Sequence, residues 1–222
     1  NDLANIYGNL VSRTVAMSNK YFGGVLENAG AKEDVDDDLI ATVTGAYEKV
    51  RAKINEFKIS DALSEIFVIF KRANKYIDET MPWALAKDES KTARLKTVLY
   101  NLAESIVIGT SLLEPFMPDT AAKVTSYFGT TVRDYGQIAR FGGIENGTKV
   151  VENLEILFRR LDVKEVVDKA HEMYEARKKP AAPEAKEEEK PEIDIDYFAG
   201  LDLRVAKVVA CEKVPKADKL LH

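Results

Sequence analysis

The sequence reads NKYIDETMPW from Asn74 to Trp83, where an apolar-periodic segment meets a proline–tryptophan pair. The apolar positions of that segment recur at helical spacing: Leu63, Ile66, Phe67, Phe70, Ala73 and Ile77. Proline disfavours the helical conformation of the residue before it, so this helix must end near Met81. Trp83, the single tryptophan of the chain, is therefore predicted at a helix–turn corner rather than on a packed helical face.

Trp83 has two interpretations at such a corner. A core tryptophan that closes a helix end is the commoner role of a large aromatic residue taken alone. A flat ring at an exposed corner is also a platform on which an unpaired nucleobase can stack, and Asn74 and Lys75 a few residues upstream fit that use.

The N-terminal segment from Asn1 to Phe22 reads as a helix. Its apolar arc, at 100° per residue, contains Leu3, Ile6, Leu10, Thr14 and Met17. Asn5, Asn9 and Arg13 follow at intervals of four and form one row beside that arc. Two carboxamides and a guanidinium can exchange hydrogen bonds with base edges, although a solvated helix face is the ordinary use of such residues.

Further helices are predicted along the first 178 residues, which form one mainly helical domain. We expect an acidic turn at Asp34–Asp38, a helix from 39 to 57, one capped by Ser60 or Asp61 that ends before Pro82, and others over about 88–113, 120–128 and 163–178. Residues 129–150 are glycine-rich and predicted to be irregular with short extended pieces. Five packed helices with short connections indicate an antiparallel bundle.

The composition changes after this domain. Residues 179–192 hold proline, alanine, glutamate and lysine without a large apolar side chain, which predicts a flexible charged linker. Ile193–Phe198 and Leu201–Cys211 then alternate in the manner of strands. Residues 193–222 are therefore predicted to begin a small β domain.

Several kinds of site are excluded by composition. Cys211 is the only cysteine, which rules out an internal disulfide and a cysteine-built zinc site. His171 and His222 have no partner at metal-ligand spacing, so no metal site and no catalytic residue is predicted. No apolar run approaches 18 residues, and we expect no membrane partner.

The formal net charge of −5 bears on nucleic-acid binding. Neither folded part is basic enough to attract phosphates generally, so we expect no binding to DNA. RNA would be bound by readout of exposed bases. Local phosphate contacts could come from Arg51, Lys53, Lys71, Arg72 and Lys75, for which a solvated helix face is the alternative.

The polar row and the corner together resemble the anticodon-binding domain of methionyl-tRNA synthetases. The motifs are NxxxNLxSR from Asn5 to Arg13 and NKYIDExxPW from Asn74 to Trp83. The resemblance implies the helix bundle of class I synthetases, in which residues of these types read the methionine anticodon. It places four residues at the anticodon, with Trp83 stacking the first base: Asn5, Asn9, Arg13 and Trp83. Asn74 and Lys75 are candidates for supporting contacts.

Two later segments extend the likeness. Leu157–Asp162, LFRRLD, is similar to the segment by which the helical domain of this family returns to its catalytic core, with Arg159 where proline is usual. DLRVAKV from Asp202 and PKADKL from Pro215 resemble the start of the tRNA-binding OB-fold appended to some members, with Ala206 in place of the common glycine. A five-stranded barrel needs more than the roughly thirty residues present, so this fold would be incomplete.

The resemblance implies that the parent protein is a cytoplasmic enzyme that attaches methionine to its tRNA with ATP. The catalytic domain is absent from these residues, and ATP would bind there; whether zinc also does is left open. The appended OB-fold often serves as a dimer contact, which makes a homodimer of the parent an expectation. Asn1 already lies within a helix and no initiator methionine precedes it, which favours a removed upstream domain. The alternatives are a stand-alone tRNA-binding or synthetase-assembly module and a purely structural helical scaffold.

Overall fold

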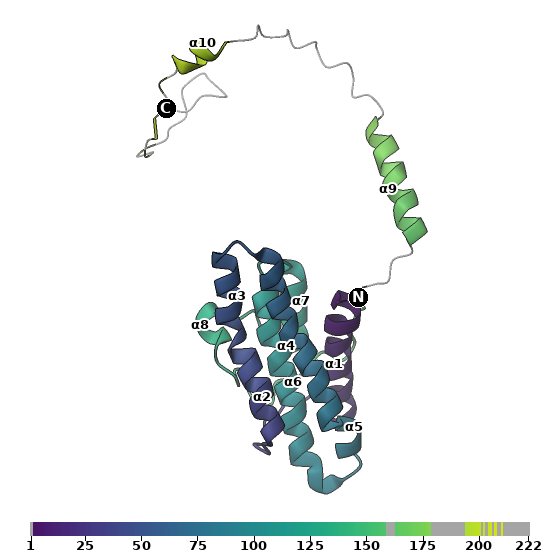
Figure 1. Cartoon of the computed structure of the whole chain (residues 1–222). Helices are drawn as coiled ribbons and strands as arrows, with labels where there is room; N and C mark the ends of the chain where they lie inside the picture. Colours follow the sequence, from purple (N-terminus) through teal and green to yellow (C-terminus); the bar gives the residue numbers. More distant parts are fainter. Residues whose placement is uncertain are drawn as a thin grey trace. The chain divides into compact units, whose positions relative to one another are not determined.

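The structure is a computed structural model that describes residues 2–158, 163–178, 194–200, 202, 204, 205, 207 and 210. The chain divides into two units, Asn1–Asp162 and Val163–His222. The first unit is a helix bundle, drawn in purple to teal in Figure 1. Its helices are η1 (Asp2–Gly8, a π-helix), α1 (Asn9–Phe22), α2 (Asp34–Thr44), α3 (Ala46–Asn55), α4 (Ile59–Thr80), α5 (Pro82–Leu85), η2 (Glu89–Lys91, a 3-10 helix), α6 (Thr92–Leu113), α7 (Pro118–Tyr127) and α8 (Tyr135–Ile138).

Helix α6 forms the centre of the bundle. Apart from Lys96, every residue from Arg94 to Leu113 is buried, because α1, α2, α4 and α7 surround the helix. Helix α4 runs antiparallel to it, as Figure 1 shows. A Cβ atom on Gly109 would lie 2.6 Å from the Phe70 ring, so the absence of a side chain lets the two helices approach. The predicted mainly helical fold is confirmed.

The N-terminal helix differs from the prediction in its register. Tyr7 is fully buried, whereas Leu3, expected on the apolar arc, is 38% exposed. Residues 2–8 form the wider turns of a π-helix, so a constant 100° per residue does not apply there. The Tyr7 ring lies 4.5 Å from that of Phe70, and its hydroxyl shares a 2.8 Å hydrogen bond with the hydroxyl of Thr110. These contacts turn tyrosine inward and leucine outward.

The structure has two helices, α2 and α3, where one helix was predicted over 39–57. The acidic residues expected to form a turn are the first turn of α2, where Glu33 and Asp36 make a reciprocal capping box. Carboxylates are favourable at that position because they face the positive end of the helix dipole. Gly45 separates α2 from α3.

Three smaller predictions in the bundle need correction. Helix α4 begins at Ile59 with Lys58 at its cap position, so neither Ser60 nor Asp61 caps it. Helix α7 begins at Pro118, since proline is tolerated in the first turn of a helix. The region 129–150 is mostly irregular, as predicted, but contains the short helix α8.

A buried polar network joins α2, α4 and α6. The Asp36 carboxylate accepts two hydrogen bonds from the Arg94 guanidinium, at 2.6 and 2.8 Å, and one from the Tyr76 hydroxyl, at 2.6 Å. Burial opposes ionisation of Asp36, but the hydrogen bonds from Arg94, Tyr76 and the Glu33 amide together hold its pKa below the ordinary value. The Tyr76 hydroxyl also accepts from the Asn101 amide, so the network is continuous.

Acid should weaken the bundle through Asp36. Because its pKa is lowered in the folded state, the ionised carboxylate stabilises the fold above the unfolded-chain pKa of about 3.9. This contribution is lost as the pH falls through the folded-state pKa, at up to about 1.4 kcal/mol per pH unit. Urea denaturation from neutral pH to about pH 3 measures the loss. Asp36→Asn has no carboxylate to protonate, so its free energy of unfolding should fall less over that pH range. An equal fall in the wild type and in Asp36→Asn would contradict this role of Asp36.

A second buried network holds the glycine-rich region against α6. The fully buried Glu104 forms a bidentate ion pair with Arg133. The same carboxylate accepts hydrogen bonds from the backbone amides of Gly142, Gly143 and Ile144, at 2.8 to 3.1 Å. One α6 side chain therefore fixes a loop about forty residues further along the chain.

The second unit contains α9 (Val163–Lys178), which confirms the predicted charged helix, and α10 (Ile195–Ala199). The strand predicted over 193–198 is wrong for Ile195–Phe198, since the Phe198 amide donates to the Asp194 carbonyl in a helical turn. The linker 179–192 lies outside the described residues. The second predicted strand also lies outside them, except for a few positions. The incomplete OB-fold therefore stays a prediction. Within the part of the chain that the structure describes, no helix is long and apolar enough to cross a membrane.

Candidate nucleic-acid interface

The proline–tryptophan corner has the geometry that the sequence predicts. Helix α4 ends at Thr80, and Met81 adopts a left-handed conformation with φ of 44°. The buried Pro82 begins the short helix α5, and Trp83 follows with 44% of its surface exposed. The alternative of a fully buried core tryptophan is therefore wrong.

Hydrogen bonds hold the corner in this conformation. The Met81 amide donates to the Ile77 carbonyl at 2.9 Å, and the Met81 carbonyl accepts from the Ala84 amide at 2.8 Å. A left-handed conformation costs a residue with a side chain roughly 1–2 kcal/mol, so neighbouring contacts must maintain it. The backbone that carries Trp83 is thus held by a hydrogen-bonded turn.

The polar row of the first helix lies on the surface of the bundle. Asn5 belongs to η1, Asn9 is the first residue of α1, and Arg13 follows one turn later. Both asparagines are exposed and the arginine is half-buried. Among the residues that the structure describes, the side chains of Asn9 and Arg13 have no intramolecular hydrogen bond or ion pair, so they keep their full capacity for a ligand.

A groove of about 450 Å³ runs beside this row. Asn5, Asn9 and Ser12 form its polar side, and residues 156–158 form its apolar side. The Phe158 ring contacts Gly8, where a Cβ atom would lie 3.1 Å from it. Sequence reasoning identified the LFRRLD segment but not its packing on the first helix. Residues 159–162 of that motif lie outside the described residues.

The half-buried Asn74 ties η1 to α4, about two helical turns before the corner. Its amide group donates to the carbonyl oxygens of Ile6, at 3.2 Å, and Phe70, at 2.9 Å. Helices α1 and α4 run in the same direction in Figure 1. Arg13 lies seven residues after Ile6, and Met81 lies seven residues after Asn74. Each interval is about 10 Å along its helix. Arg13 and the corner therefore lie at similar levels, whereas the groove beside Asn5 and Asn9 does not include Trp83.

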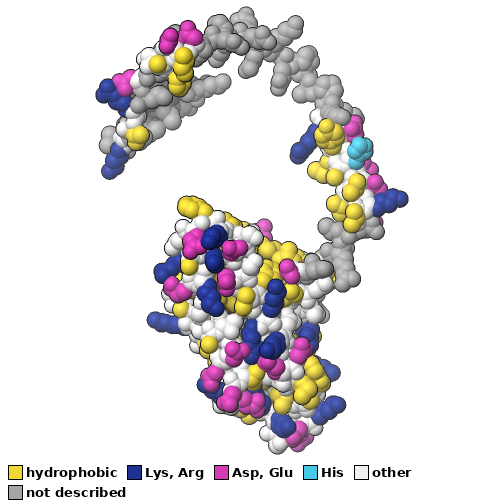
Figure 2. Space-filling view, in the orientation of Figure 1, with side chains coloured by type: hydrophobic (Ala, Val, Ile, Leu, Met, Phe, Trp, Pro, Cys, Tyr) yellow, Lys and Arg dark blue, Asp and Glu magenta, His cyan; other side chains and the backbone are white. Residues whose placement is uncertain are grey.

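The basic residues near the corner differ in their availability. Lys75 is exposed and only 3.4 Å from the Glu79 carboxylate, a surface ion pair of little energetic weight. Arg72 is largely buried and bonded to Asp38 and Glu79, so it serves the fold. Figure 2 shows cationic and anionic side chains interspersed over the drawn face of the bundle, without a broad basic patch.

These features define a class of structure: a helix bundle with a half-exposed tryptophan at a hydrogen-bonded corner and a surface row of polar side chains. Among the described residues, no group of histidine, cysteine, aspartate or glutamate side chains is arranged to hold a metal ion.

The comparisons with known proteins identify the family. Residues 26–179 match the model of the anticodon binding domain of methionyl tRNA ligase, so the chain belongs to that family. It is 46% identical over 221 residues to the methionine–tRNA ligase of Clostridium perfringens and 40% identical over 230 residues to that of Bacillus subtilis. Each alignment covers 99% of this chain and 34% of the relative, so the chain spans about a third of their length.

Solved structures agree in fold. The apo form of Mycobacterium tuberculosis methionyl-tRNA synthetase superimposes with a TM-score of 0.67 at 32% identity, over 72% of this chain and 33% of that one. The same enzyme in complex with methionyl-adenylate gives a TM-score of 0.66 over 72% and 31%.

Proposed function

We propose that this chain binds the anticodon loop of methionine tRNA. The observation that carries the proposal is the fixed corner that holds a half-exposed tryptophan at the level of a guanidinium without an intramolecular partner. Trp83 stacks the first anticodon base, while Arg13 and Asn9 bond base edges, with Asn5 further along the row. Asn74 acts indirectly, by holding η1 in place.

The supporting contacts follow the same logic. Lys75 can approach a phosphate, because its ion pair with Glu79 is exposed to solvent and therefore weak. Contacts to bases determine sequence specificity, whereas contacts to phosphates position the protein on the RNA. An interface whose contacts are mainly to bases should therefore depend more on the anticodon sequence than on the ionic strength.

We further propose that the parent protein is a cytoplasmic methionine–tRNA ligase that uses ATP. ATP, and any zinc, would bind in the part of the ligase outside this chain. The names of the relatives support a ligase over a stand-alone tRNA-binding or assembly module. Dimerisation of the parent through an OB-fold begun by residues 193–222 remains part of the proposal.

Binding of the 222-residue chain to tRNA tests the function. Filter binding should show higher affinity for methionine tRNA than for the same tRNA with one anticodon base changed. The tRNA body is identical in the two ligands, so the difference isolates the anticodon. Equal affinity for both would overturn the proposal.

Replacing the polar row should erode this discrimination. Asn9→Ala or Arg13→Ala removes a base-edge contact, so binding to the cognate tRNA should weaken by about 1–2 kcal/mol and binding to the altered tRNA by less. Ser64→Ala changes an exposed serine on α4 outside the groove and serves as the control. An equal loss for both tRNAs would mean that Asn9 and Arg13 act on the backbone or on the fold.

A further inference from the structure

A pocket in the glycine-rich region is lined by residues that the proposed function does not use. It has a volume of about 430 Å³, which is the size of a site for a small molecule rather than for a single ion. The side chains that line it come from the loop after α7, from α8 and from the segment that follows: Thr130, Thr131, Arg133, Gln137, Arg140 and Phe141.

The pocket and the polar row of the first helix lie on opposite sides of the bundle. Helix α8 packs beside α3, where the rings of Tyr47 and Tyr135 stack with their centres 5.7 Å apart. Helix α1 lies on the other side of α4 and α6, as Figure 1 shows. An anticodon loop bound at the polar row would therefore leave the pocket free.

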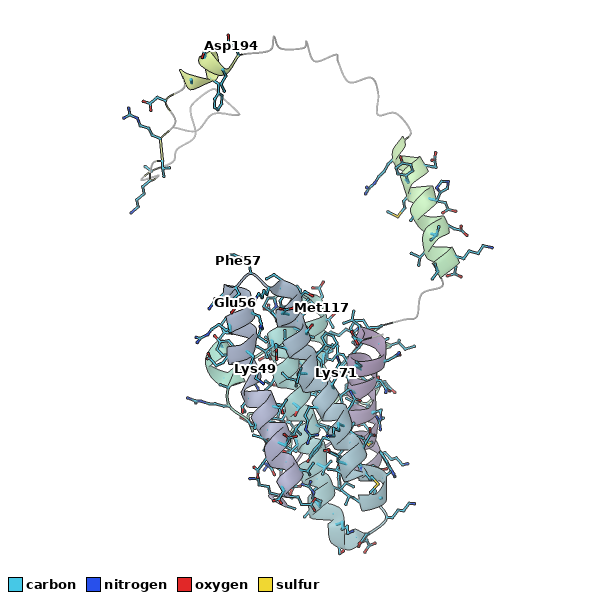
Figure 3. The ribbon with its side chains drawn as sticks, in the orientation of Figure 1. Lys49, Glu56, Phe57, Lys71, Met117 and Asp194 are labelled. Carbon is cyan, nitrogen blue, oxygen red and sulfur yellow. The ribbon has the colours of Figure 1, made fainter. Side chains whose placement is uncertain are left out.

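The pocket is also displaced along the bundle from the tryptophan corner. The backbone amide of Arg133 donates to the Ser111 hydroxyl at 3.0 Å, in the last turn of α6. Figure 3 shows Met117, and Phe57 in the turn between α3 and α4, at this end of the bundle, whereas α5 lies at the opposite end. A ligand of the pocket is thus separate from the anticodon.

The polar side chains around the pocket are hydrogen-bond donors without partners. Among residues 2–158, every arginine except Arg13 and Arg140 forms an ion pair with a carboxylate. The exposed guanidinium of Arg140 has no hydrogen bond or ion pair within that range. The side chains of Thr130, Thr131 and Gln137 likewise make no hydrogen bond to the described part of the chain. All four can contact a ligand without breaking an existing bond.

Arg133 supplies a buried donor at the wall of the pocket. It is 8% exposed, and both of its terminal nitrogens bond the Glu104 carboxylate. Its Nε–H has no acceptor among residues 2–158, yet it is not sealed from solvent. A Cβ atom on Gly143 would lie 2.9 Å from the guanidinium carbon, so the loop packs directly on Arg133 and fixes its position.

The charges around the pocket favour an anion. Arg140 carries a positive charge without an acidic partner, while the charge of Arg133 is balanced by the fully buried Glu104, which does not line the pocket. The Asp134 carboxylate is close in sequence, but it accepts a hydrogen bond from the Gln137 backbone amide at 3.0 Å and is not a lining residue. The pocket therefore has a net positive charge.

The number of donors favours a phosphate over a carboxylate. The pocket presents groups from two guanidinium side chains, one carboxamide and two hydroxyls. A guanidinium pairs with either kind of anion. A terminal phosphate offers three strong acceptor oxygens and a charge of about −2, whereas a carboxylate offers two oxygens and a single charge. The phosphate thus satisfies more of these donors, and the volume that remains beside Phe141 holds an organic group.

We propose that this pocket binds a small phosphorylated molecule. Its phosphate group is bound by the Arg140 guanidinium and the Nε–H of Arg133, with further donors from the two hydroxyls and the carboxamide. Its organic part lies against the half-buried Phe141 ring. The site is independent of the proposed function, because it shares no residue with the polar row or the corner.

Titration of the 222-residue chain with ribose 5-phosphate and with ribose tests the site, since the two compounds differ only in the phosphate group. In NMR spectra, ribose 5-phosphate should cause saturable shifts of the Thr131 and Gln137 backbone amides, with an affinity at least about tenfold above that of ribose. Inorganic phosphate should shift the same amides. Absence of saturable shifts with both phosphate compounds, or equal affinity for ribose, would overturn the proposal.

A charge-matched pair of variants shows whether the contact is local. Arg140→Gln removes a charge-assisted contact from an exposed residue, so it should weaken ribose 5-phosphate binding at least about tenfold and leave thermal unfolding unchanged. Lys58→Gln removes the same charge from an exposed residue that is bonded to Glu56 and lies outside the lining of the pocket. It should leave the affinity unchanged. An equal effect of the two variants would overturn the proposal.

Methionine tRNA distinguishes a free phosphate compound from the phosphates of an RNA backbone. Arg140→Gln should leave the affinity for this tRNA unchanged. If it weakens tRNA binding instead, and if tRNA shifts the Thr131 and Gln137 amides, the pocket holds an RNA phosphate and the proposal is overturned. Failure of the wild-type chain to distinguish anticodons would refute the proposed function alone, because the ribose 5-phosphate titration does not depend on it.

Discussion

Glu104→Gln should lower the free energy of unfolding by about 3–5 kcal/mol, a large share of the stability of a domain of this size. The substitution keeps the shape of the side chain and one of its two acceptor oxygens. It leaves the Arg133 guanidinium buried, 8% exposed, without an opposing charge. Urea denaturation followed by far-UV circular dichroism measures the change.

The double variant provides the control for this effect. Arg133→Met together with Glu104→Gln leaves no buried charge unpaired, so it should be more stable than Glu104→Gln alone. Glutamine can still accept hydrogen bonds from the amides of Gly142 and Gly143. A loss below about 1 kcal/mol for Glu104→Gln would show that water reaches Arg133 and that the ion pair is not the anchor of the loop.

Trp83→Ala should weaken binding of methionine tRNA by about 1–3 kcal/mol, the scale of one lost base–aromatic stack. The effect on folding should be smaller than for a core aromatic, because almost half of the ring is exposed. Filter binding measures affinity, and urea denaturation of the same sample checks the fold.

Two variants make this result specific. Trp83→Phe keeps a smaller ring and should recover part of the affinity. Tyr135→Ala removes another exposed aromatic, from α8, and should leave tRNA affinity unchanged. Unchanged affinity in a folded Trp83→Ala chain would remove the tryptophan from the anticodon site.

The corner was predictable because it rests on local covalent constraints. Pro82 restricts Met81 whatever the tertiary structure, and the apolar spacing of α4 is long and regular. Part of the polar row was predictable for a similar reason: a spacing of four places Asn9 and Arg13 on one face of α1, whereas Asn5 lies in the π-helix η1. Both features depend on residues near each other in the sequence.

The features that sequence reasoning missed depend on distant residues. The inward position of Tyr7 needs Phe70 and Thr110, and the groove needs Phe158, far along the chain from Gly8. The capping box of α2 did leave a signal, the Glu33–Asp36 spacing, which was interpreted as a turn. No pattern within residues 129–150 indicates that Glu104 fixes them.

The length of α4 has a consequence for signalling between its two ends. A single helix of 22 residues, about 33 Å long, connects the Phe57 turn to the Met81 corner, and α6 is equally long and packed beside it. Two long helices packed side by side bend little, so they keep the two ends of the bundle at a constant distance from each other. Adding or deleting a turn would change the span by about 5 Å and rotate Trp83 about the axis by only a small angle. The bundle would then fix the distance between its two ends rather than relay a change of shape from one end to the other.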